Sequence, residues 1–510
     1  MSGRVPSMTG RLPHRLSHRL VRQMSTNAHV IPFNPEKPAT ADAARLWATA
    51  YRAEKAPKVG TARTLYGAGP DGGHAVLSAL GAGFAKERPD AKRERVRKAV
   101  GAAVKSVKEL EDLAKLTIDT AGEPQAAAAA AHLALYKFSL KTSPGSPFAP
   151  GATVPVPEKV EIAPSETSEE WVRGVVTGRA QNLARTLMEL PANMMTPTAF
   201  TERVKKEFAG LDNVEIIVRD AAWAESKGMN AFLSVTHGSA QPAKFMEIHY
   251  KGAPSKDAQP LALVGKGITF DTGGISLKPR AGMKDMRADM GGAAVVVSTA
   301  LAVAQLKLPV NLVVTTPLTE NMPGGRATKP GDIVYAMNGK SIEVDNTDAE
   351  GRLVLSDAIY YTATEYKPHT LLDVATLTGA IGYALSDVFT GVFSSSDDLW
   401  DELHAAGEAE YDRFWRVPLD EDYGPQIYSS NADLCNTGGS EGGACTAALF
   451  LKAFAPGIEG EGDAPPALRW AHIDIAGVME HTRPTPYMEK GMSGRPVRPL
   501  VEFIRRACQQ

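Results

Sequence analysis

The C-terminal part of the chain alternates between short, β-rich apolar runs and longer stretches with helical periodicity. The apolar runs predict strands at Val214–Val218, Phe245–Tyr250, Leu261–Val264, Asn311–Pro317 and Leu371–Ala375. Apolar residues at helical spacing predict helices between several of them, at Phe200–Phe208, Ala293–Leu306 and Leu353–Glu365. This alternation predicts a largely parallel sheet with helices on both faces. A functional site is then expected at the carboxyl ends of the strands.

The N-terminal part shows a second α/β pattern and carries no constellation of catalytic residue types. Helical periodicity covers Leu46–Ala53, Val96–Leu113 and Gln125–Tyr136, and the alanine run in the last of these is a strong helix former. Residues 143–166 are rich in Pro, Ser and Gly and predict a connection, with a short strand at Lys159–Ile162. The expected roles of this part are structure, assembly or covering of the active site.

A long helical pattern at Glu169–Met188 is expected to bridge the two halves, and Thr196 before Pro197 predicts the N-cap of the next helix. We predict an α/β protein with a smaller N-terminal α/β domain and a larger C-terminal α/β domain, whose mixed, largely parallel sheet is flanked by helices. The predicted divisions are a basic leader at 1–35, the N-terminal domain and Pro-rich connection at 36–166, the bridging helix at 167–190 and the C-terminal catalytic domain at 191–510.

Residues 1–35 form a basic segment without a single Asp or Glu. Leucines at 12, 16 and 20 lie on one helical stripe, beside a stripe of arginines at 11, 15 and 19. An amphipathic, Arg-rich, acid-free N-terminus is typical of a mitochondrial transit peptide. The alternatives are a disordered basic tail, or an upstream start codon with Met24 beginning the functional protein. We therefore expect a mitochondrial or a cytoplasmic location.

Composition narrows the class of protein. A chain of 510 residues predicts two or three domains, and a net charge of -2 gives no sign of a nucleic-acid partner. No apolar run approaches the roughly 20 residues needed to span a bilayer. Three cysteines form neither a disulfide framework nor a CxxC metal site, which favours a reducing compartment. Cys445 has no accompanying base motif, so a small buried thiol is expected there rather than a nucleophile.

A glycine-rich segment, Gly265–Lys278, follows the strand predicted at Leu261–Val264. Its charged residues are Lys266, Asp271 and Lys278, and its glycines permit a tight backbone near a ligand. A phosphate-binding loop is one interpretation, but the P-loop pattern of Lys followed by Ser or Thr is absent. Taken alone, this segment does not indicate a function.

Two further segments carry carboxylates next to predicted helices. Asp289 stands just before the apolar helix and could be a helix cap, and Asp348 in Asn346–Leu353 could be an ordinary turn residue. However, Asp348, Glu350 and Arg352 are spaced two apart, so all three point to the same side of an extended backbone. The octet Asn346–Leu353 therefore indicates a cation site, formed by the two carboxylates, with the arginine as an anion-binding arm.

The combination of segments is more informative than any one of them. Asp271, Asp289, Asp348 and Glu350 each lie in a run of small or apolar residues, where an unpaired charge would be costly. Two divalent cations would neutralise these carboxylates, and paired metals can bind a shared hydroxide and stabilise a tetrahedral transition state. Lys278 and Arg352 would then remain for a developing oxyanion or a small bound anion.

These segments resemble those of the leucyl aminopeptidase family of two-zinc exopeptidases. The similarity rests on Val264–Gly274, Met286–Gly292 and Asn346–Leu353, the last of which is the family signature. Supporting blocks follow in the family's order over roughly residues 185–505: Glu320–Pro323, Lys329–Asp332, Met337–Lys340, Ala375–Ala380 and Trp470–Gly477. Leu187–Pro191 is only a loose match to the family's usual Leu-x-Asn-x-Pro. This departure puts the inter-domain contact in doubt rather than the metal site.

The resemblance implies the ligands residue by residue. The tight zinc site would use Lys266, Asp271, Asp289 and Glu350. The exchangeable site, open to Zn²⁺, Mn²⁺, Co²⁺ or Mg²⁺, would use Asp271, Asp348 and Glu350. Lys278 would polarise the scissile carbonyl, and Arg352 would hold a bicarbonate that acts as general base. Positions lining the pocket for the first side chain are Met286, Thr376 and Gly379, and those near the substrate backbone are Thr376 and Leu377.

The implied activity is release of N-terminal residues, preferably leucine and other apolar ones, from peptides. The resemblance also implies a homohexamer, a dimer of trimers. The alternative is a hexameric DNA-binding or assembly protein on the same scaffold, against which the near-neutral charge argues. His472 and Asp474 lie on a probable core strand and are expected to be buried structural residues rather than ligands.

Overall fold

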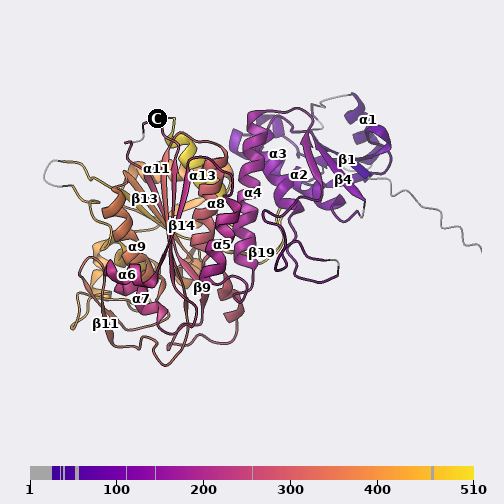
Figure 1. Ribbon diagram of the computed structural model, residues 1–510. Helices are drawn as coiled ribbons and strands as arrows, with labels where there is room; N and C mark the ends of the chain where they lie inside the picture. The colour runs from indigo at the N-terminus through magenta and orange to yellow at the C-terminus, as the bar shows by residue number, and fades with distance from the viewer. Residues whose placement is uncertain are drawn as a thin grey trace, which may run out of the picture.

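The computed structural model describes residues 26–509 apart from 35, 38–40, 52–56, 111, 144, 256 and 461–463. Two α/β lobes lie beside each other, the N-terminal one in indigo and purple (Figure 1). Each lobe is built on its own principal sheet, one of five strands and one of nine. The predicted α/β class with a smaller N-terminal domain is therefore confirmed.

The N-terminal sheet has the order β2-β3-β1-β4-β5, with only β2 antiparallel to its neighbour. Its strands are β1 (Thr26–Phe33), β2 (Ala62–Leu65), β3 (His74–Ala79), β4 (Leu113–Ile118) and β5 (Glu161–Pro164). The leader expected at 1–35 overlaps β1, which is the central strand and pairs with both β3 and β4. The folded domain therefore includes Thr26–Phe33, and the arginine stripe lies outside the described residues.

Three helices cover the N-terminal sheet: α1 (Ala41–Ala50), α2 (Pro89–Val107) and α3 (Pro124–Leu135). Val30 packs with α2 and α3 on one face, whereas Ile31 packs with α1 on the other. The helix predicted at Val96–Leu113 is wrong at its C-terminal end, because it stops at Val107 and Leu113 begins β4. Pairing of β4 with β1 decides the conformation of an apolar segment that suits either structure.

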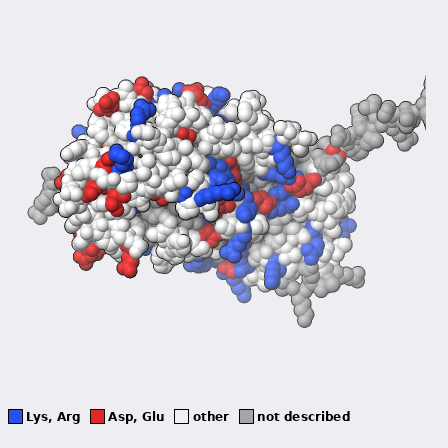
Figure 2. Space-filling view, turned by 90° about the horizontal axis from the view of Figure 1, so that it is seen from below, with Lys and Arg blue, Asp and Glu red and all other residues white. Residues whose placement is uncertain are grey.

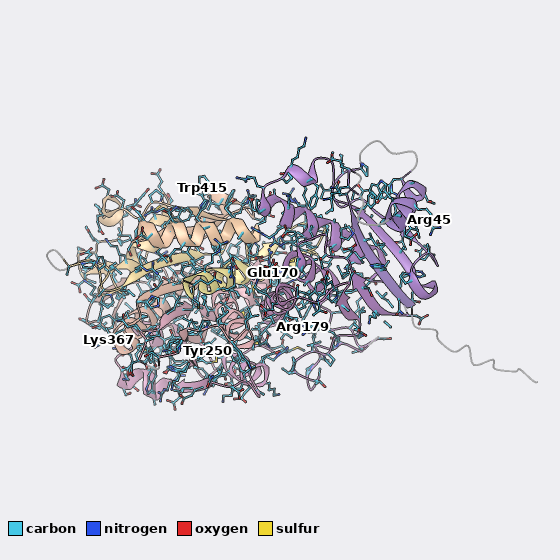
Figure 3. The ribbon with its side chains drawn as sticks, turned by 90° about the horizontal axis from the view of Figure 1, so that it is seen from above. Arg45, Glu170, Arg179, Tyr250, Lys367 and Trp415 are labelled. Atoms are coloured by element: carbon cyan, nitrogen blue, oxygen red, sulfur yellow. The ribbon has the colours of Figure 1, made fainter. Side chains whose placement is uncertain are left out.

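Helix α4 (Glu169–Glu189) lies between the two lobes and contacts both α3 and α8 (Figure 1). The Ser168 side chain caps it by accepting a hydrogen bond from the Trp171 amide. The α3–α4 contact is close because α3 presents alanines and α4 presents glycines: a Cβ at Gly174 would lie 2.3 Å from the Gln125 carbonyl oxygen. Glu170 and Arg179, both on α4, lie where the lobes meet (Figure 3).

A buried ionic network also joins the lobes. Arg97 on α2 forms an ion pair of 2.8 Å with Glu410, which ends α11. Arg498 on α13 contacts the same carboxylate at 3.2 Å and donates a hydrogen bond to Gln181 of α4. Gln125 of α3 donates to the other Glu410 oxygen. Removing one member of such a buried set leaves an uncompensated charge, so the network fixes how the domains sit against each other.

The large sheet has the order β15-β14-β17-β13-β8-β10-β7-β6, with β9 alongside β10. Its strands are β6 (Val214–Asp220), β7 (Lys244–Lys251), β8 (Leu261–Gly265), β9 (Gly267–Asp271), β10 (Asn311–Asn321), β13 (Thr370–Ala375), β14 (Thr390–Ser394), β15 (Phe414–Arg416) and β17 (Arg469–Asp474). The central strands β17, β13, β8 and β10 run parallel, and antiparallel pairs flank them. The strands predicted here are all present, and the sheet is mixed as expected.

Helices cover both faces of this sheet. One face packs against α4 together with α5 (Pro197–Glu207), α8 (Gly291–Gln305), α11 (Asp397–Glu410) and α13 (Val497–Ala507). The other packs against α6 (Ala221–Ser226), α7 (Asn230–Thr236), α9 (Gly351–Tyr366) and α12 (Gly443–Lys452). The predicted cap at Thr196 is confirmed, because its side chain accepts a hydrogen bond from the Ala199 amide.

Helix α8 and the turn before it correct the expectation that no apolar run is long enough to span a bilayer. Met283–Gln305 is long and apolar enough, by length and composition, to cross a bilayer. In this structure 94% of its most apolar stretch is buried inside the protein. The helix packs between α4, α13 and the large sheet, which explains why it is apolar all round.

Small elements complete the two lobes. A three-stranded sheet of β11 (Asp332–Tyr335), β12 (Ser341–Val344) and β16 (Leu434–Cys435) leads directly into the signature octet. The remaining elements are α10 (Gly379–Leu385), the hairpin β18 (Glu480–His481) with β19 (Gly491–Met492), and the 3-10 turns η1 (Pro70–Gly72), η2 (Phe84–Lys86), η3 (Met283–Ala288) and η4 (Glu421–Gln426).

Candidate metal centre and active site

The predicted site residues gather where the parallel strands end. Lys266 follows β8, Asp271 ends β9, and Thr376 follows β13. Asp289 lies between η3 and α8, and Glu350 directly precedes α9. Because β8, β10 and β13 run parallel, their carboxyl ends meet at one edge of the sheet. The fold thus brings residues from distant parts of the chain into one cluster.

Lys266 is the centre of the inner half of this cluster. Its Nζ lies 2.7 Å from Asp289 Oδ2 and 2.9 Å from Glu350 Oε1, and it donates a hydrogen bond of 2.9 Å to the Thr376 carbonyl. Position 351, which follows Glu350 in the signature, must be small, because a Cβ at Gly351 would lie 2.6 Å from Cε of Lys266. The octet's glycine is therefore explained by this lysine.

Lys278 holds the outer half of the cluster. Its Nζ lies 2.8 Å from Asp271 Oδ2 and also forms an ion pair with Asp348. The other Asp271 oxygen, Oδ1, accepts hydrogen bonds of 2.8 Å from the Gly273 amide and from Asn321 Nδ2. Asp271 is therefore oriented by its own loop and by the end of β10.

Three of these carboxylates are placed to share a cation. Asp271, Asp348 and Glu350 each offer an oxygen, and the three oxygens lie within 4.8 Å of one another. Glu350 Oε2 is buried, and no described residue donates a hydrogen bond to it. A buried carboxylate oxygen without a partner is costly, and oxygen donors suit divalent cations. The residues present therefore fit a metal centre.

The pKa shifts of the clustered residues also favour a bound cation. Burial raises the pKa of Glu350 above its ordinary value, and the neighbouring Asp271 carboxylate raises it further. Burial also raises the pKa values of Asp289 and Asp348, partly offset by the lysines. For Lys266, burial alone would lower the pKa, but Asp289 and Glu350 outweigh it and the pKa is raised. The cluster thus disfavours accumulated negative charge and favours cations.

Arg352 lies in the first turn of α9, beside the carboxylates but not paired with them. The residue is only 7% exposed, and its buried Nε and Nη1 have no hydrogen-bond partner among the described residues. Burial lowers the pKa of Arg352 to about 10, against the opposing effect of Glu350. A buried cation with free N–H groups is suited to a small anion. The extended backbone predicted for the octet is wrong, because Glu350 has helical backbone angles and Arg352 already belongs to α9. The anion-binding role of Arg352 stays a prediction.

The residues expected to contact substrate lie on two loops. Met286 is half-buried in η3, and Gly379 begins α10, where an added Cβ would meet no atom within 4 Å. The Thr376 hydroxyl donates a hydrogen bond of 2.7 Å to Asp289, so this side chain orients a carboxylate instead of facing a pocket. The Leu377 amide donates to Asp474, which fixes the loop that carries it.

The alternative interpretations of single residues are now resolved. Asp289 does not cap α8: the N-cap is Met290, and the Asp289 carboxylate is paired with Lys266. Asp348 does take part in a turn, because its amide donates to Asn346 Oδ1, but its carboxylate faces Lys278. The lysines of the glycine-rich segment contact carboxylates, which leaves the phosphate-loop interpretation without support.

Other residues outside the cluster have structural roles. His472 Nδ1 lies 2.5 Å from Asp373, and both are fully buried between β17 and β13. Asp474 accepts hydrogen bonds from Thr378 Oγ1 and from backbone amides, so both residues are structural as predicted. Burial raises the pKa of Cys445, which makes its thiol a poor nucleophile.

Sequence reasoning missed the amides that hold the ligand loops. Asn321 at the end of β10 donates both to Asp271 and to the Thr347 carbonyl. Asn436 after β16 donates to the carbonyls of Asn346 and Ala349. Asn321 lies within Glu320–Pro323, a block of the family resemblance, and this was the only signal that could have pointed to it. Asn436 stands in no such block.

Comparisons with known proteins show the family of the chain. A model of the cytosol aminopeptidase family, catalytic domain, matches residues 182–501. The cytosol aminopeptidase of Dictyostelium discoideum is 44% identical over 462 residues, which cover 89% of this chain and 86% of that protein. The cytosol aminopeptidase of Homo sapiens is 45% identical over 460 residues, covering 89% of this chain and 84% of that protein.

Solved structures share the fold over nearly the whole chain. The bottromycin maturation enzyme BotP has a TM-score of 0.78 and 29% identity, covering 96% of this chain and 100% of that one. BotP in complex with Mn has a TM-score of 0.79 and 30% identity, covering 95% and 100%. The resemblance drawn from the motifs is thus confirmed. The chain belongs to the cytosol aminopeptidase family and is an aminopeptidase.

Proposed function

We propose that this aminopeptidase uses two divalent cations and prefers N-terminal leucine and other apolar residues. The observation that carries the proposal is a cluster of four carboxylates, of which Asp271, Asp289 and Glu350 are buried and Asp348 is half-buried. Within it, Glu350 Oε2 has no partner among the described residues. Lys266, Asp271, Asp289 and Glu350 would hold the tight zinc ion, and Asp271, Asp348 and Glu350 an exchangeable Zn²⁺, Mn²⁺, Co²⁺ or Mg²⁺. The similar BotP structure in complex with Mn supports a divalent metal. When bound, the cations would supply Lewis acidity and lower the pKa of the attacking water.

The residues of the chain itself would provide the remaining chemistry. Lys278 is half-buried and can exchange its ion pair with Asp348 for the oxygen of the scissile carbonyl. Arg352 would hold a bicarbonate by its unpaired Nε–H and Nη1–H and so would place a base beside the attacking water. The preference for an apolar first side chain rests on the family resemblance at Met286 and Gly379, and Gly379 leaves space beside it because an added Cβ would meet no atom within 4 Å.

A set of variants tests the division of roles. Asp271→Ala and Glu350→Ala are expected to lose bound metal and activity together. Lys278→Met should keep its metal content but lose turnover by about 10²–10³-fold, as for removal of one oxyanion donor. Metal content is measured by mass spectrometry, and activity with a panel of aminoacyl amides after reloading apo protein with Zn²⁺, Mn²⁺ or Co²⁺. Full activity in Asp271→Ala protein without bound metal would refute the mechanism.

Assembly as a homohexamer, a dimer of trimers, remains part of the proposal and rests on the family. Large exposed apolar side chains support a partner surface: Tyr335 and Ile333 on the edge strand β11 are 61% and 40% exposed. Basic side chains gather near the middle of the face in Figure 2, with acidic ones among them, so a polyanion partner gains little support. Light scattering gives the assembly state, and a salt-dependent shift of duplex DNA would revive the DNA-binding alternative.

We also propose a mitochondrial location, with the cytoplasm as the alternative. Its support is the acid-free, Arg-rich composition before β1. A fluorescent protein fused to residues 1–35 is expected to enter mitochondria. A fusion that stays in the cytosol would remove this proposal without touching the enzymatic one.

A further inference from the structure

The Asn436 side chain is completely buried between the small sheet and the loop that carries Asp348 and Glu350. Its Oδ1 accepts hydrogen bonds from the amides of Asp345 and Asn346, at 2.9 and 3.2 Å. Its Nδ2 donates to the carbonyls of Asn346 and Ala349, at 2.7 and 3.3 Å. One side chain thus satisfies four backbone groups of the ligand loop.

The chemistry of these contacts requires an amide at position 436. Oδ1 meets two N–H donors, whereas Nδ2 meets two carbonyl acceptors. A carboxylate of the same shape would set an oxygen against both carbonyls, which is repulsive in a dry interior. A hydroxyl is too short to contact both ends of the loop. Asn436 therefore contributes a specific pattern of donors and acceptors rather than packing volume alone.

The same loop is held from its other side by the strand-end residues. Asn321 Nδ2 donates 3.0 Å to the Thr347 carbonyl, and Thr347 Oγ1 donates 2.6 Å to the Gly273 carbonyl. Those contacts tie the loop to the segment of Asp271. Asn436 fixes the loop from the opposite direction, because its backbone N–H donates a hydrogen bond to the Glu343 carbonyl of β12. The loop is thus clamped between β12 and the β9–β10 edge.

We propose that Asn436 is a positioning residue of the metal centre, which sets the separation of Asp348 and Glu350 from Asp271. It contacts none of these carboxylates, so it acts only through the backbone of residues 345–349. The proposal rests on the proposed two-metal function. Its consequence is that metal affinity depends on an amide that binds neither metal nor substrate.

The test compares Asn436→Asp with a matched change on the same small sheet. Asn338, in the turn between β11 and β12, also uses its amide on the backbone: it accepts from the Lys340 amide and donates to the Ala453 carbonyl. Asn338→Asp is therefore the control for replacing a loop-binding amide away from the ligands. Full-length proteins are stripped of metal, and Mn²⁺ affinity is measured by competition with a chromophoric chelator. Thermal midpoint, kcat and KM for leucine amide are recorded in parallel.

Asn436→Asp is expected to weaken Mn²⁺ binding by about 10–100-fold, as for other residues that orient ligands. Its kcat should be low at limiting Mn²⁺ and recover at saturating Mn²⁺, with KM near the wild-type value. Asn338→Asp should match the wild type in Mn²⁺ affinity, kcat and KM. A purely structural role would lower the thermal midpoint without this metal rescue.

Two results would overturn the proposal. One is wild-type Mn²⁺ affinity in Asn436→Asp, and the other is an equal loss in Asn338→Asp. If Asn436→Asp does not accumulate as folded protein, Asn436→Ser is judged by the same criteria. Wild-type protein that neither binds Mn²⁺ nor depends on metal for turnover would instead refute the proposed function, which is a distinct outcome.

Discussion

Replacing Arg352 by methionine should make the metal-free protein more stable while it impairs catalysis. The guanidinium is buried, and its Nε and Nη1 have no partner among the described residues. Burial lowers the pKa of Arg352 from 12.5 to about 10. At about 1.4 kcal/mol per pKa unit, the charged form is penalised in the folded state by about 3 kcal/mol at any pH well below 10. Arg352→Met removes that penalty and keeps most of the apolar volume.

We therefore expect Arg352→Met to raise the thermal midpoint of protein in carbonate-free buffer, by up to the equivalent of about 3 kcal/mol. Added bicarbonate should stabilise the wild type through linkage and leave the variant unchanged. Calorimetry with and without bicarbonate makes both measurements, and turnover of leucine amide gives the functional loss.

Arg498→Met is the matched control, because Arg498 is as buried but fully engaged. It donates to Gln181 and to Glu410, so its loss should destabilise the protein by about 3–5 kcal/mol. The two substitutions should thus shift the midpoint in opposite directions. A fall in the Arg352→Met midpoint as large as that of Arg498→Met would refute the reasoning, since it would mean that the Arg352 charge is compensated.

Two further predictions concern the ends of α4 and of the Pro-rich connection. Glu189 accepts a hydrogen bond from the Met492 amide at 2.7 Å and forms an ion pair with Arg287 at 3.0 Å. Glu189→Gln should therefore lower the free energy of unfolding by about 1–3 kcal/mol in calorimetry. It should also reduce kcat/KM, because Arg287 adjoins Met286, and an unchanged kcat/KM would contradict this. For Glu158, burial alone would raise the pKa, but hydrogen bonds from His132 and Arg179 lower it to about 2. Because the folded pKa is below the unfolded one, this contribution is present above pH 4.5 and is lost as pH falls toward 2. Proteolysis of residues 143–166 should therefore accelerate in acid, and Glu158→Gln should cleave fast at every pH; identical pH profiles would refute the role of this ion pair.

Elements with strong local periodicity were predictable from the sequence. Glu169–Glu189 and Gly351–Tyr366 match the predicted helices within a few residues, because their apolar spacing fits no strand. The first strand was not recognised, because Thr26–Phe33 adjoins a leader-like composition and its identity depends on pairing with β3 and β4. Strand pairing is a tertiary effect that periodicity does not contain.

The carboxylates of the candidate site stand out in the sequence, whereas the residues that support them do not. Asp271, Asp289 and Glu350 stand out because carboxylates among small residues are unusual. By contrast, the Thr376 hydroxyl was expected in a pocket, and only folding shows that it serves Asp289. Asparagine is common in loops, so nothing in the neighbourhood of Asn436 distinguishes a side chain that binds a loop about 90 residues earlier.

The late position of Asn436 in the chain has a consequence for biosynthesis. Glu350 leaves the ribosome 86 residues before Asn436, which at 5–20 residues per second is an interval of roughly 4–17 s. During this interval the carboxylates exist without the amide that holds their loop. The loop that carries Asp348 and Glu350 therefore reaches its final backbone geometry only after residue 436 has been added to the chain.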